Sequence, residues 1–336
     1  MPSGGRAFVY HLVDILTRNG FDAYVLHQKE NFRYSWFENT VPVRWTHQIK
    51  RSRLETLEQW GKFHLDRLRE HRVNTPTVTD AVTVDSKDVL VIPETRAHLF
   101  SRTLPGVPKI ILNQNPYFFA QNAGLKTPEI SIYHPDIKGC IAMSKIDYEI
   151  HRLIVPDNIW YVPYFIDADR YRYSRTKKRQ IAYMPRRLKE DSDAVTNLLK
   201  LRDNLKGFTF VPIQDVNQQQ VAEVMKESLI FLSFSNREGF GLPPAEAMAC
   251  GCIVIGYSGN GGDEFFDKGV AIKVPYGDLV KYINSVERTI ADYERDPGNL
   301  DRFRLRASNY ILQTYSKDKT RDCLLSAWNE IKNIER

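Results

Sequence analysis

The sequence predicts an α/β protein with parallel sheets, for three reasons. Short apolar runs recur along the 336 residues, and stretches with helical periodicity lie between them. The runs are apolar without alternation, as expected for strands buried on both faces of a parallel sheet. Loops rich in glycine, proline and polar residues follow several of these runs. The length favours two domains rather than one.

The predicted strands and helices follow one another along most of the chain. Strands are expected at residues 22–27, 88–93, 108–114, 139–143, 158–162, 180–184, 207–212, 229–235, 252–258 and 269–274. Helices are expected at residues 8–16, 145–153, 221–225, 245–250, 279–290, 300–315 and 318–334. Gly4 and Gly5 are expected to form a turn before the first helix, and Ser144 is expected to cap the helix that follows it.

Residues 229–266 form two consecutive strand–loop–helix units. The loop at 236–242 follows the first strand, and the loop at 259–262 follows the second. Open α/β sheets bind ligands at the carboxyl ends of their strands. Glycine-rich loops and helix N-termini also present N–H groups to anions. We therefore expect a ligand that contains phosphate at these two loops.

Two carboxylates lie in this region with seven residues between them, Glu238 in the first loop and Glu246 in the following helix. Pro243 and Pro244 suit the start of that helix, because the N–H group that proline lacks has no helical partner there. We expect Glu246 in the first turn, where the helix dipole stabilises an ionised carboxylate by about 0.3–1 kcal/mol. Such a carboxylate can accept hydrogen bonds from vicinal hydroxyls. Asp263 is expected to cap the helix after the second loop.

The string EGFGLPPAEAMACG at residues 238–251 resembles the Glu-x7-Glu signature of retaining glycosyltransferases with the GT-B fold, in the family-4 group (glycosyl transferases group 1). The loop and the helix both match, so the resemblance is more specific than two acids at a fixed spacing. It covers most of the chain from Cys140 onward, but only loops and strand ends before that residue.

The resemblance implies two Rossmann-like domains that face a central cleft. The acceptor-side domain is expected at residues 1–163 and the nucleotide-sugar-binding domain at 164–316. Residues 317–336 are expected to form a helix that crosses back to the N-terminal domain. The implied reaction transfers a sugar from a nucleoside-diphosphate sugar to a hydroxyl of a glycan, a lipid-linked molecule or a small molecule. It needs no metal or other cofactor.

The resemblance also assigns residues to the donor, for which UDP or GDP is the expected carrier. Glu238 is implied to contact the sugar, and Glu246 to bind the ribose hydroxyls. Backbone N–H groups after Glu238 hold sugar hydroxyls, the second glycine loop lies by the diphosphate, and an apolar side chain contacts the base. These further contacts are implied for Phe240, Gly241, Leu242, Gly261, Gly262 and Ile213.

Basic residues near 186 are implied to hold the diphosphate. Relatives carry Gly-Arg-Leu here and a Lys six positions after the Arg. Arg186 or its neighbour Arg187 supplies the Arg, but the Lys position carries Ser192 or Asp193, and Lys189 is the expected substitute. Negative charge develops on the leaving diphosphate, and each well-placed donor contributes about 3 kcal/mol to its stabilisation.

Acceptor-side candidates lie in the N-terminal half. Glu94, Gln114 and Asn115 end buried strands, where polar side chains are expected to face a ligand. Many relatives carry a His near Gln114, and an amide at this position can hydrogen-bond a sugar but cannot act as a base. Gly4 and Gly5 are expected to approach the donor phosphates or the acceptor.

Two parts of the N-terminal half depart from the family pattern. Relatives begin with a strand before the glycine turn, and here that strand is absent, so we expect the true start to lie upstream. Residues 32–37 form an aromatic cluster, and a basic run at 50–53 precedes an amphipathic helix at 54–68. This stretch is a candidate surface for an anionic or lipid-linked acceptor.

The composition is that of an ordinary globular chain with a net charge of +6 and a pI near 9.0. A nucleotide diphosphate or an anionic membrane surface suits this charge, and no nucleic-acid-binding motif is present. The four cysteines lack metal-ligand spacing, and we expect free thiols in a reducing cytosol. No run approaches the ~18 apolar residues of a membrane span, and no signal peptide is recognisable. We therefore expect a cytoplasmic protein, with peripheral contact at the inner face of the membrane as an option.

Other functions remain open. The missing Lys and His would suit a nucleotide-sugar-binding pseudoenzyme that supports a partner transferase. A glycoside hydrolase would use Glu238 and Glu246 as acid and base, which requires a raised pKa that the helix dipole opposes. Asp167 and Asp169 suggest metal-dependent transfer only weakly. A dinucleotide oxidoreductase is disfavoured because no Gly-x-Gly-x-x-Gly follows a strand.

Overall fold

The structure is a computed structural model, and it describes residues 4–34, 37, 39–49, 79–99, 103–122, 134–154, 157–185 and 188–334. The chain groups into two compact units. The first unit comprises residues 1–112, 119–141 and 324–336, and the second comprises residues 113–118 and 142–323. The predicted domain boundaries at residues 163 and 316 stay predictions.

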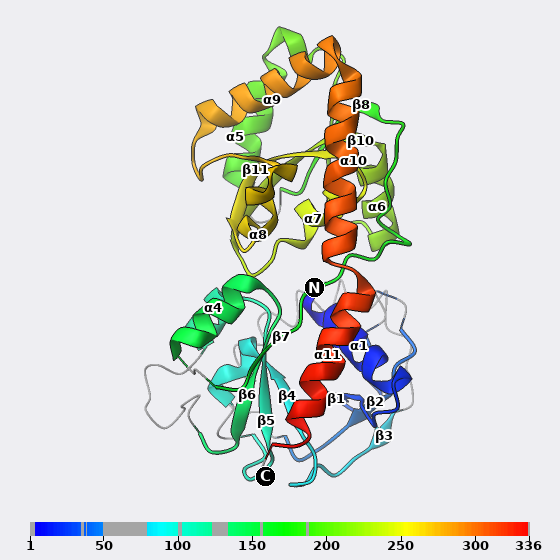
Figure 1. Cartoon of the computed structure of the whole chain (residues 1–336), viewed down its shortest axis with the longest axis vertical. Helices are drawn as coiled ribbons and strands as arrows, with labels where there is room; N and C mark the ends of the chain where they lie inside the picture. Colours follow the sequence, from blue (N-terminus) through cyan, green and yellow to red (C-terminus); the bar gives the residue numbers. More distant parts are fainter. Residues whose placement is uncertain are drawn as a thin grey trace. The chain divides into compact units, whose positions relative to one another are not determined.

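The second unit contains a five-stranded parallel sheet (Figure 1). Its strands, in spatial order, are β12 (Ile272–Lys273), β11 (Ile253–Asn260), β10 (Ser228–Glu238), β8 (Lys178–Tyr183) and β9 (Thr209–Pro212). The central strand β10 is buried over its first eight residues. A strand covered on both faces must be apolar throughout, which is the pattern that predicted it.

Helices supply the rest of the core of the second unit. They are α5 (Lys189–Lys200), α6 (Gln218–Glu227), α7 (Leu242–Ala249), α8 (Asp263–Phe265), α9 (Leu279–Arg295) and α10 (Pro297–Thr314), with 3-10 helix η2 (Asp203–Leu205) and π-helical turn η3 (Phe266–Val270). Ile230 of β10, Leu199 of α5 and Ile290 of α9 belong to one fully buried cluster. Burial of each such side chain stabilises the fold by about 1.5–3 kcal/mol.

Two separate sheets lie in the N-terminal half. One is parallel, in the order β1 (Val25–His27), β2 (Val43–Trp45), β3 (Asp80–Ala81). The other has the order β4 (Leu90–Pro93), β5 (Lys109–Asn113), β6 (Ile137–Ala142), β7 (Ile159–Tyr161). Short helical segments accompany them: η1 (Glu94–Leu99), α3 (Pro116–Asn122) and α4 (Lys145–Ile154). The sequence did not predict β2 or β3, which have only three and two residues.

The first helix, α1 (Gly4–Arg18), corrects one prediction. Gly4 and Gly5 are its first two residues and do not form a turn before it. Tyr10 and Val13 of α1 pack with Val25 and Val43 in the core beneath the three-stranded sheet.

The last helix, α11 (Lys317–Ile331), is shared between the units, because residues from Leu324 onward group with the first unit. Beyond it, the Lys332 ammonium lies 5.8 Å from the ring centroid of Phe21. The return of residues 317–336 to the N-terminal domain stays a prediction.

Candidate functional site

Glu238 is the last residue of β10, not a loop residue as predicted. It pairs in register with Asn260, the last residue of β11, after an irregularity that begins at Ser235. Glu238 is half-buried. The two strand ends therefore bring the carboxylate and the second glycine loop to one edge of the sheet, where ligands of such sheets bind.

Helix α7 begins as its prolines predict. Gly241 is the N-cap with φ 93°, a left-handed conformation that glycine adopts without strain, and prolines occupy the first turn. Pro243 and Pro244 lack N–H groups, so they remove two of the free donors that a helix start normally offers. Of the helix-start donors, those of Gly241 and Leu242 remain, which confines hydrogen bonds from this helix start to a ligand to the loop end.

The two glycine loops touch through their backbones. A Cβ atom on Gly261 would lie 2.3 Å from the carbonyl carbon of Gly239, and one on Gly262 would lie 2.5 Å from the oxygen of Ser258. A Cβ on Gly239 would lie 2.0 Å from the oxygen of Gln114. A Cβ atom does not approach another atom more closely than 3.0 Å. Backbone packing alone therefore requires glycine at positions 239, 261 and 262.

The Phe240 side chain is an anchor for the first loop. It is 2% exposed and packs against three aromatic rings, those of Tyr164, Phe265 and Tyr315, at centroid distances of 5.3, 5.3 and 4.9 Å. A ligand can therefore reach residue 240 mainly through its backbone. The Phe240 ring therefore holds the loop in place, whereas direct contact between this side chain and the donor would be a different role.

Glu246 lies in the second turn of α7 rather than the first. We expected the helix dipole to stabilise its ionised form, but its environment favours the protonated form. Burial raises its pKa to about 7, while the Tyr171 hydroxyl bonds to its carboxyl group and the Arg170 charge lowers the pKa in part. Desolvation disfavours the charged form, and here it outweighs the helix dipole. The carboxyl group is thus close to half-protonated at neutral pH.

The second loop also corrects one prediction. Gly262 is the N-cap of α8, and Asp263 is the first helical residue, with no side-chain cap. The Asp263 carboxylate instead accepts a hydrogen bond from the Ser258 hydroxyl and pairs with Lys273 at 2.7 Å. It therefore joins the end of β11 to β12.

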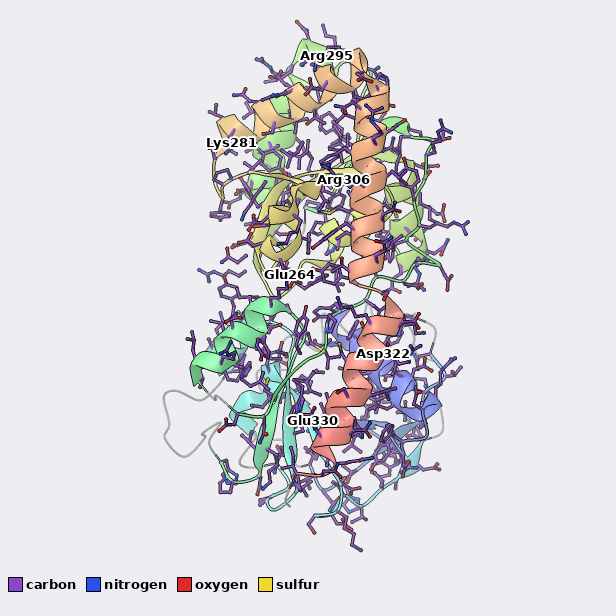
Figure 2. The ribbon with its side chains drawn as sticks, viewed as in Figure 1. Glu264, Lys281, Arg295, Arg306, Asp322 and Glu330 are labelled. Atoms are coloured by element: carbon purple, nitrogen blue, oxygen red, sulfur yellow. The ribbon has the colours of Figure 1, made fainter. Side chains whose placement is uncertain are left out.

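Glu264, labelled in Figure 2, follows on the same short helix. Its Oε2 atom accepts a hydrogen bond from the Lys145 N–H at the start of α4, 3.2 Å away. Burial raises the pKa of Glu264 to about 7. At the same helix start, Ser144 caps α4 as predicted, since its hydroxyl accepts from the Asp147 N–H at 3.2 Å.

The segment at residues 113–118 connects β5 to α3 and groups with the second unit. Asn115 is 5% exposed, and both ends of its amide are occupied. Its Oδ1 atom accepts from the Tyr117 N–H, and its Nδ2 atom donates to the Arg237 oxygen, each at 2.9 Å. Nδ2 of Asn260 donates a hydrogen bond to the Tyr117 hydroxyl. The segment therefore contacts the ends of both β10 and β11.

The other predicted acceptor-side residues differ in exposure. Gln114 is half-buried. Glu94 is the first residue of η1 and is 2% exposed. A sugar contact by Gln114, Asn115 or Glu94 stays a prediction.

The predicted base and diphosphate contacts lie on neighbouring elements. Ile213 follows β9, is buried, and donates its N–H to the Tyr183 oxygen at 2.8 Å. Lys189 is the first residue of α5 and forms an exposed ion pair with Asp193, one turn on. Such pairs contribute about 0.3–0.5 kcal/mol, so this one is easily exchanged for a ligand. Arg186 and Arg187 lie outside the described residues, as does the predicted helix at 54–68.

Metal-binding clusters and membrane-spanning helices are both lacking in the described part of the chain. There, no group of three or more His, Cys, Asp and Glu side chains is placed to hold a metal ion. Asp167, from the weak metal alternative, instead accepts from the Asp169 N–H at 3.1 Å and lies 3.5 Å from Arg170. None of the helices described is long and apolar enough to cross a membrane.

Sequence reasoning missed four residues of this region: Gly239, Tyr171, Tyr117 and Asn260. Gly239 stands next to Glu238, and the paired Glu-Gly and Gly-Gly loops could have suggested a close backbone approach. Tyr171, Tyr117 and Asn260 stand in no local sequence pattern that marks them, because their partners lie 75 or more positions away in the chain. Tyr171 pairs with Glu246, and Tyr117 pairs with Asn260.

Comparison with known proteins supports the resemblance. Residues 189–298 match the family model described as "Glycosyl transferases group 1". An alpha-1,6-glucosyltransferase of Actinobacillus pleuropneumoniae is 28% identical over 224 residues, which are 64% of this chain and 67% of that protein.

Solved structures support the fold. Sucrose-phosphate synthase from Thermosynechococcus elongatus superposes with a TM-score of 0.62 at 14% identity, over 98% of this chain and 94% of that one. A TarM variant of S. aureus, in complex with Fondaparinux, alpha-GlcNAc-glycerol and UDP, gives a TM-score of 0.56 at 16% identity over 74% of this chain. The matched region spans only 56% of the TarM chain. Residues 189–298 are therefore similar to the group 1 glycosyl transferases, and the superpositions show that the chain has the GT-B fold.

Proposed function

We propose that this protein is a retaining glycosyltransferase that moves a sugar from a nucleoside-diphosphate sugar to a hydroxyl acceptor, without a metal ion. One observation carries the proposal. Glu238, at the end of β10, pairs with Asn260 at the end of β11, and the glycine loops that follow the two strands touch. A carboxylate and a row of backbone N–H groups thus share the edge of the sheet at which such folds bind ligands.

In this proposal Glu238 orients the donor sugar and is not a nucleophile. The N–H groups of Gly241 and Leu242 are the helix-start donors left by the two prolines, and they suit sugar hydroxyls next to the carboxylate. The acceptor hydroxyl attacks the anomeric carbon from the face that the diphosphate leaves. The carbon–oxygen bond to the diphosphate breaks with its electron pair on the phosphate oxygen, and that oxygen takes the acceptor proton.

Glu246 binds the ribose hydroxyls of the donor. The raised pKa of Glu246 weakens ribose binding at neutral pH, because the carboxyl group accepts two hydrogen bonds best when it is ionised. Ribose hydroxyls are donors, and hydrogen bonds to the charged form lower a carboxyl pKa. Nucleotide binding should therefore release a proton from Glu246 near neutral pH.

Cations near α5 complete the proposed site. Lys189, with Arg186 and Arg187, would stabilise the charge that develops on the diphosphate. The substitution of Lys189 for the usual Lys stays a proposal, because its present partner is Asp193. UDP and GDP are the proposed carriers, and the complex of TarM with UDP makes UDP the first to test.

Two alternatives deserve direct comparison. The pKa of about 7 at Glu246 removes our earlier objection to a glycoside hydrolase, since an acid catalyst needs such a value. The family match to residues 189–298 nevertheless favours transfer. A pseudoenzyme would bind the sugar nucleotide in the same way without turnover.

The first test is thermal stabilisation by UDP, GDP, ADP and dTDP, each with and without EDTA. A ligand at 100 times its dissociation constant adds about 2.7 kcal/mol to the free energy of unfolding, which gives a clear rise in melting temperature. We expect one nucleotide to stabilise the protein equally in the presence of EDTA. Its sugar conjugates are then assayed for transfer, and the anomeric configuration of the product is read by NMR.

The outcomes separate the readings. Transfer with retention supports the proposal, and binding without turnover supports the pseudoenzyme. Glu238→Ala should abolish transfer and leave nucleotide affinity largely intact, whereas Glu246→Ala should weaken that affinity. Loss of turnover in both variants at unchanged affinity would refute the assigned roles. If no nucleotide stabilises the folded protein, the proposal fails.

A further inference from the structure

The segment at residues 113–118 holds the backbone next to Glu238. The Asn115 amide has a fixed orientation, because the Tyr117 N–H can only donate and the Arg237 carbonyl can only accept. Nδ2 of Asn115 therefore donates to the Arg237 oxygen at 2.9 Å, while Oδ1 caps α3. The same amide thus fixes its own segment and the residue that precedes Glu238.

The residues that are held have unusual backbones. Arg237 has φ +51°, and Asn260 has φ +68°. These left-handed conformations are uncommon for residues other than glycine, and they persist where the surroundings fix them. Asn260 bonds to the Tyr117 hydroxyl through its side chain. Each of the two strand ends therefore combines a left-handed residue with a partner on the 113–118 segment.

Packing adds a third contact. A Cβ atom on Gly239, the residue after Glu238, would lie 2.0 Å from the Gln114 oxygen and 2.9 Å from the Asn115 Cα atom. The backbones on both sides of Glu238 are therefore in contact with the 113–118 segment. A shift of this segment would move the Glu238 backbone with it.

We propose that Asn115, assisted by Tyr117, is a positioning residue for the transfer reaction. Its amide fixes the backbone at Arg237 and thereby sets the direction of the Glu238 carboxylate toward the donor sugar. This inference rests on the proposed function. It gives Asn115 a role that differs from the acceptor contact expected from the sequence. Because Glu246 lies on α7 and not on this loop, Asn115 should affect the sugar and not the ribose.

Asn115→Asp isolates this contact. The carboxylate keeps an oxygen for the α3 cap, but it places an acceptor against the Arg237 carbonyl in place of a donor. Loss of a single hydrogen bond of this kind is expected to lower kcat by about 10-fold. Affinity for the stabilising nucleoside diphosphate, UDP in the first instance, should stay within twofold. Asn115→Asp should lower the melting temperature, because two acceptors then face each other at a buried site, and Asn115→Ala should lower it because the cap is lost as well.

Tyr117→Phe tests the second strand end, since it removes the hydroxyl and keeps the ring. We expect a smaller fall in kcat, again with unchanged affinity for UDP. If Asn115→Asp lowers UDP affinity and kcat together, or leaves both unchanged, the positioning role is refuted.

Amide hydrogen exchange gives a readout that does not depend on catalysis. In the unliganded full-length protein, Asn115→Asp should speed exchange at residues 236–242 and leave exchange in β8 unchanged. Unaltered exchange at 236–242 would overturn this inference even if transfer is established. Faster exchange at 236–242 in a protein that binds no nucleotide would instead support the contact between Asn115 and the Arg237 backbone and refute the proposed function.

Discussion

At the residue scale, the ionisation of Glu246 is the most consequential feature. A carboxyl group half-protonated at pH 7 binds ribose only after it loses its proton, so affinity depends on pH. The same reasoning explains why a position on α7 alone did not predict the charge state: desolvation exceeds the contribution of the helix dipole.

Nucleotide affinity is therefore predicted to increase as pH rises from 6 to 8. Below a pKa of about 7 the affinity should fall by up to about tenfold per pH unit. Tyr171→Phe, which removes the hydroxyl and keeps the buried ring, should shift this profile to higher pH, because the hydroxyl lowers the pKa of Glu246. Isothermal titration calorimetry in buffers of different ionisation enthalpy would also detect the released proton. A profile that is flat between pH 6 and 8 would contradict the prediction.

Gly239 provides a second prediction at this scale. Gly239→Ala places a methyl group 2.0 Å from a backbone oxygen, so the loop beside Glu238 must move. A displacement of about 1 Å can lower the rate by about 10²-fold, and we expect a loss of that order in transfer. The matched control is Gly298→Ala in α10, where the nearest atom lies at an ordinary 3.5 Å. Equal activity of the two variants would show that the close approach is not required.

At the element scale, the half-buried Lys177 and the buried Arg304 donate hydrogen bonds at the ends of α6 and α7. The Lys177 Nζ atom donates to the oxygens of Met225, Lys226 and Cys250 at 3.1, 2.9 and 2.8 Å. These oxygens lie at or near the C-termini of the two helices, which carry negative partial charge. Arg304 of α10 donates to the Gly251 oxygen at 2.7 Å in the same region. A cation is thus part of the packing behind the candidate site.

Lys177→Met is predicted to destabilise the second unit by about 1–3 kcal/mol, because three carbonyl oxygens lose their donor. The neighbouring Lys178 is the control, since its ion pair with Glu227 is exposed. Lys178→Met should change the free energy of unfolding by less than about 0.5 kcal/mol. Urea denaturation measures both variants. A loss for Lys178→Met as large as that for Lys177→Met would argue against a specific role of the Lys177 ammonium.

At the scale of the whole molecule, two desolvated acids and two desolvated histidines give opposite dependence of stability on pH. The pKa values of Glu246 and Glu264 are raised from 4.5 to about 7, so the folded state keeps protons that the unfolded chain releases. Their contribution falls as pH rises from about 4.5 to 7. The pKa values of His27 and His151 are lowered from 6.5 to about 4, so their contribution falls as pH drops through the same range.

The two effects should nearly cancel, and the melting temperature of the native protein is predicted to vary little between pH 5 and 7. The double variant Glu246→Gln with Glu264→Gln leaves only the histidine contribution. Its stability should therefore rise with pH across this range more steeply than that of the native protein. Scanning calorimetry at a series of pH values checks this, and parallel curves for the two proteins would rule out raised pKa values at the two acids.

The sequence by itself determined much of the α/β architecture and the location of the site. Parallel strands buried on both faces must be continuously apolar, so β5, β8, β10 and β11 could be recognised from short windows. Proline and glycine have strong local preferences, which predicted a helix start at Pro243 and Pro244, found in the first turn of α7, and a helix end before Gly251. The Glu-x7-Glu string then pointed to the group 1 glycosyl transferases, whose family model matches residues 189–298.

Only the tertiary structure decided how the site is assembled. The pKa of Glu246 depends on burial and on Tyr171, and the backbone at Arg237 depends on Asn115, 122 positions away. The short strands β2 and β3 also form only through pairing with their neighbours. Desolvation and pairing between distant segments are properties of the packed chain, and local patterns in the sequence do not carry them.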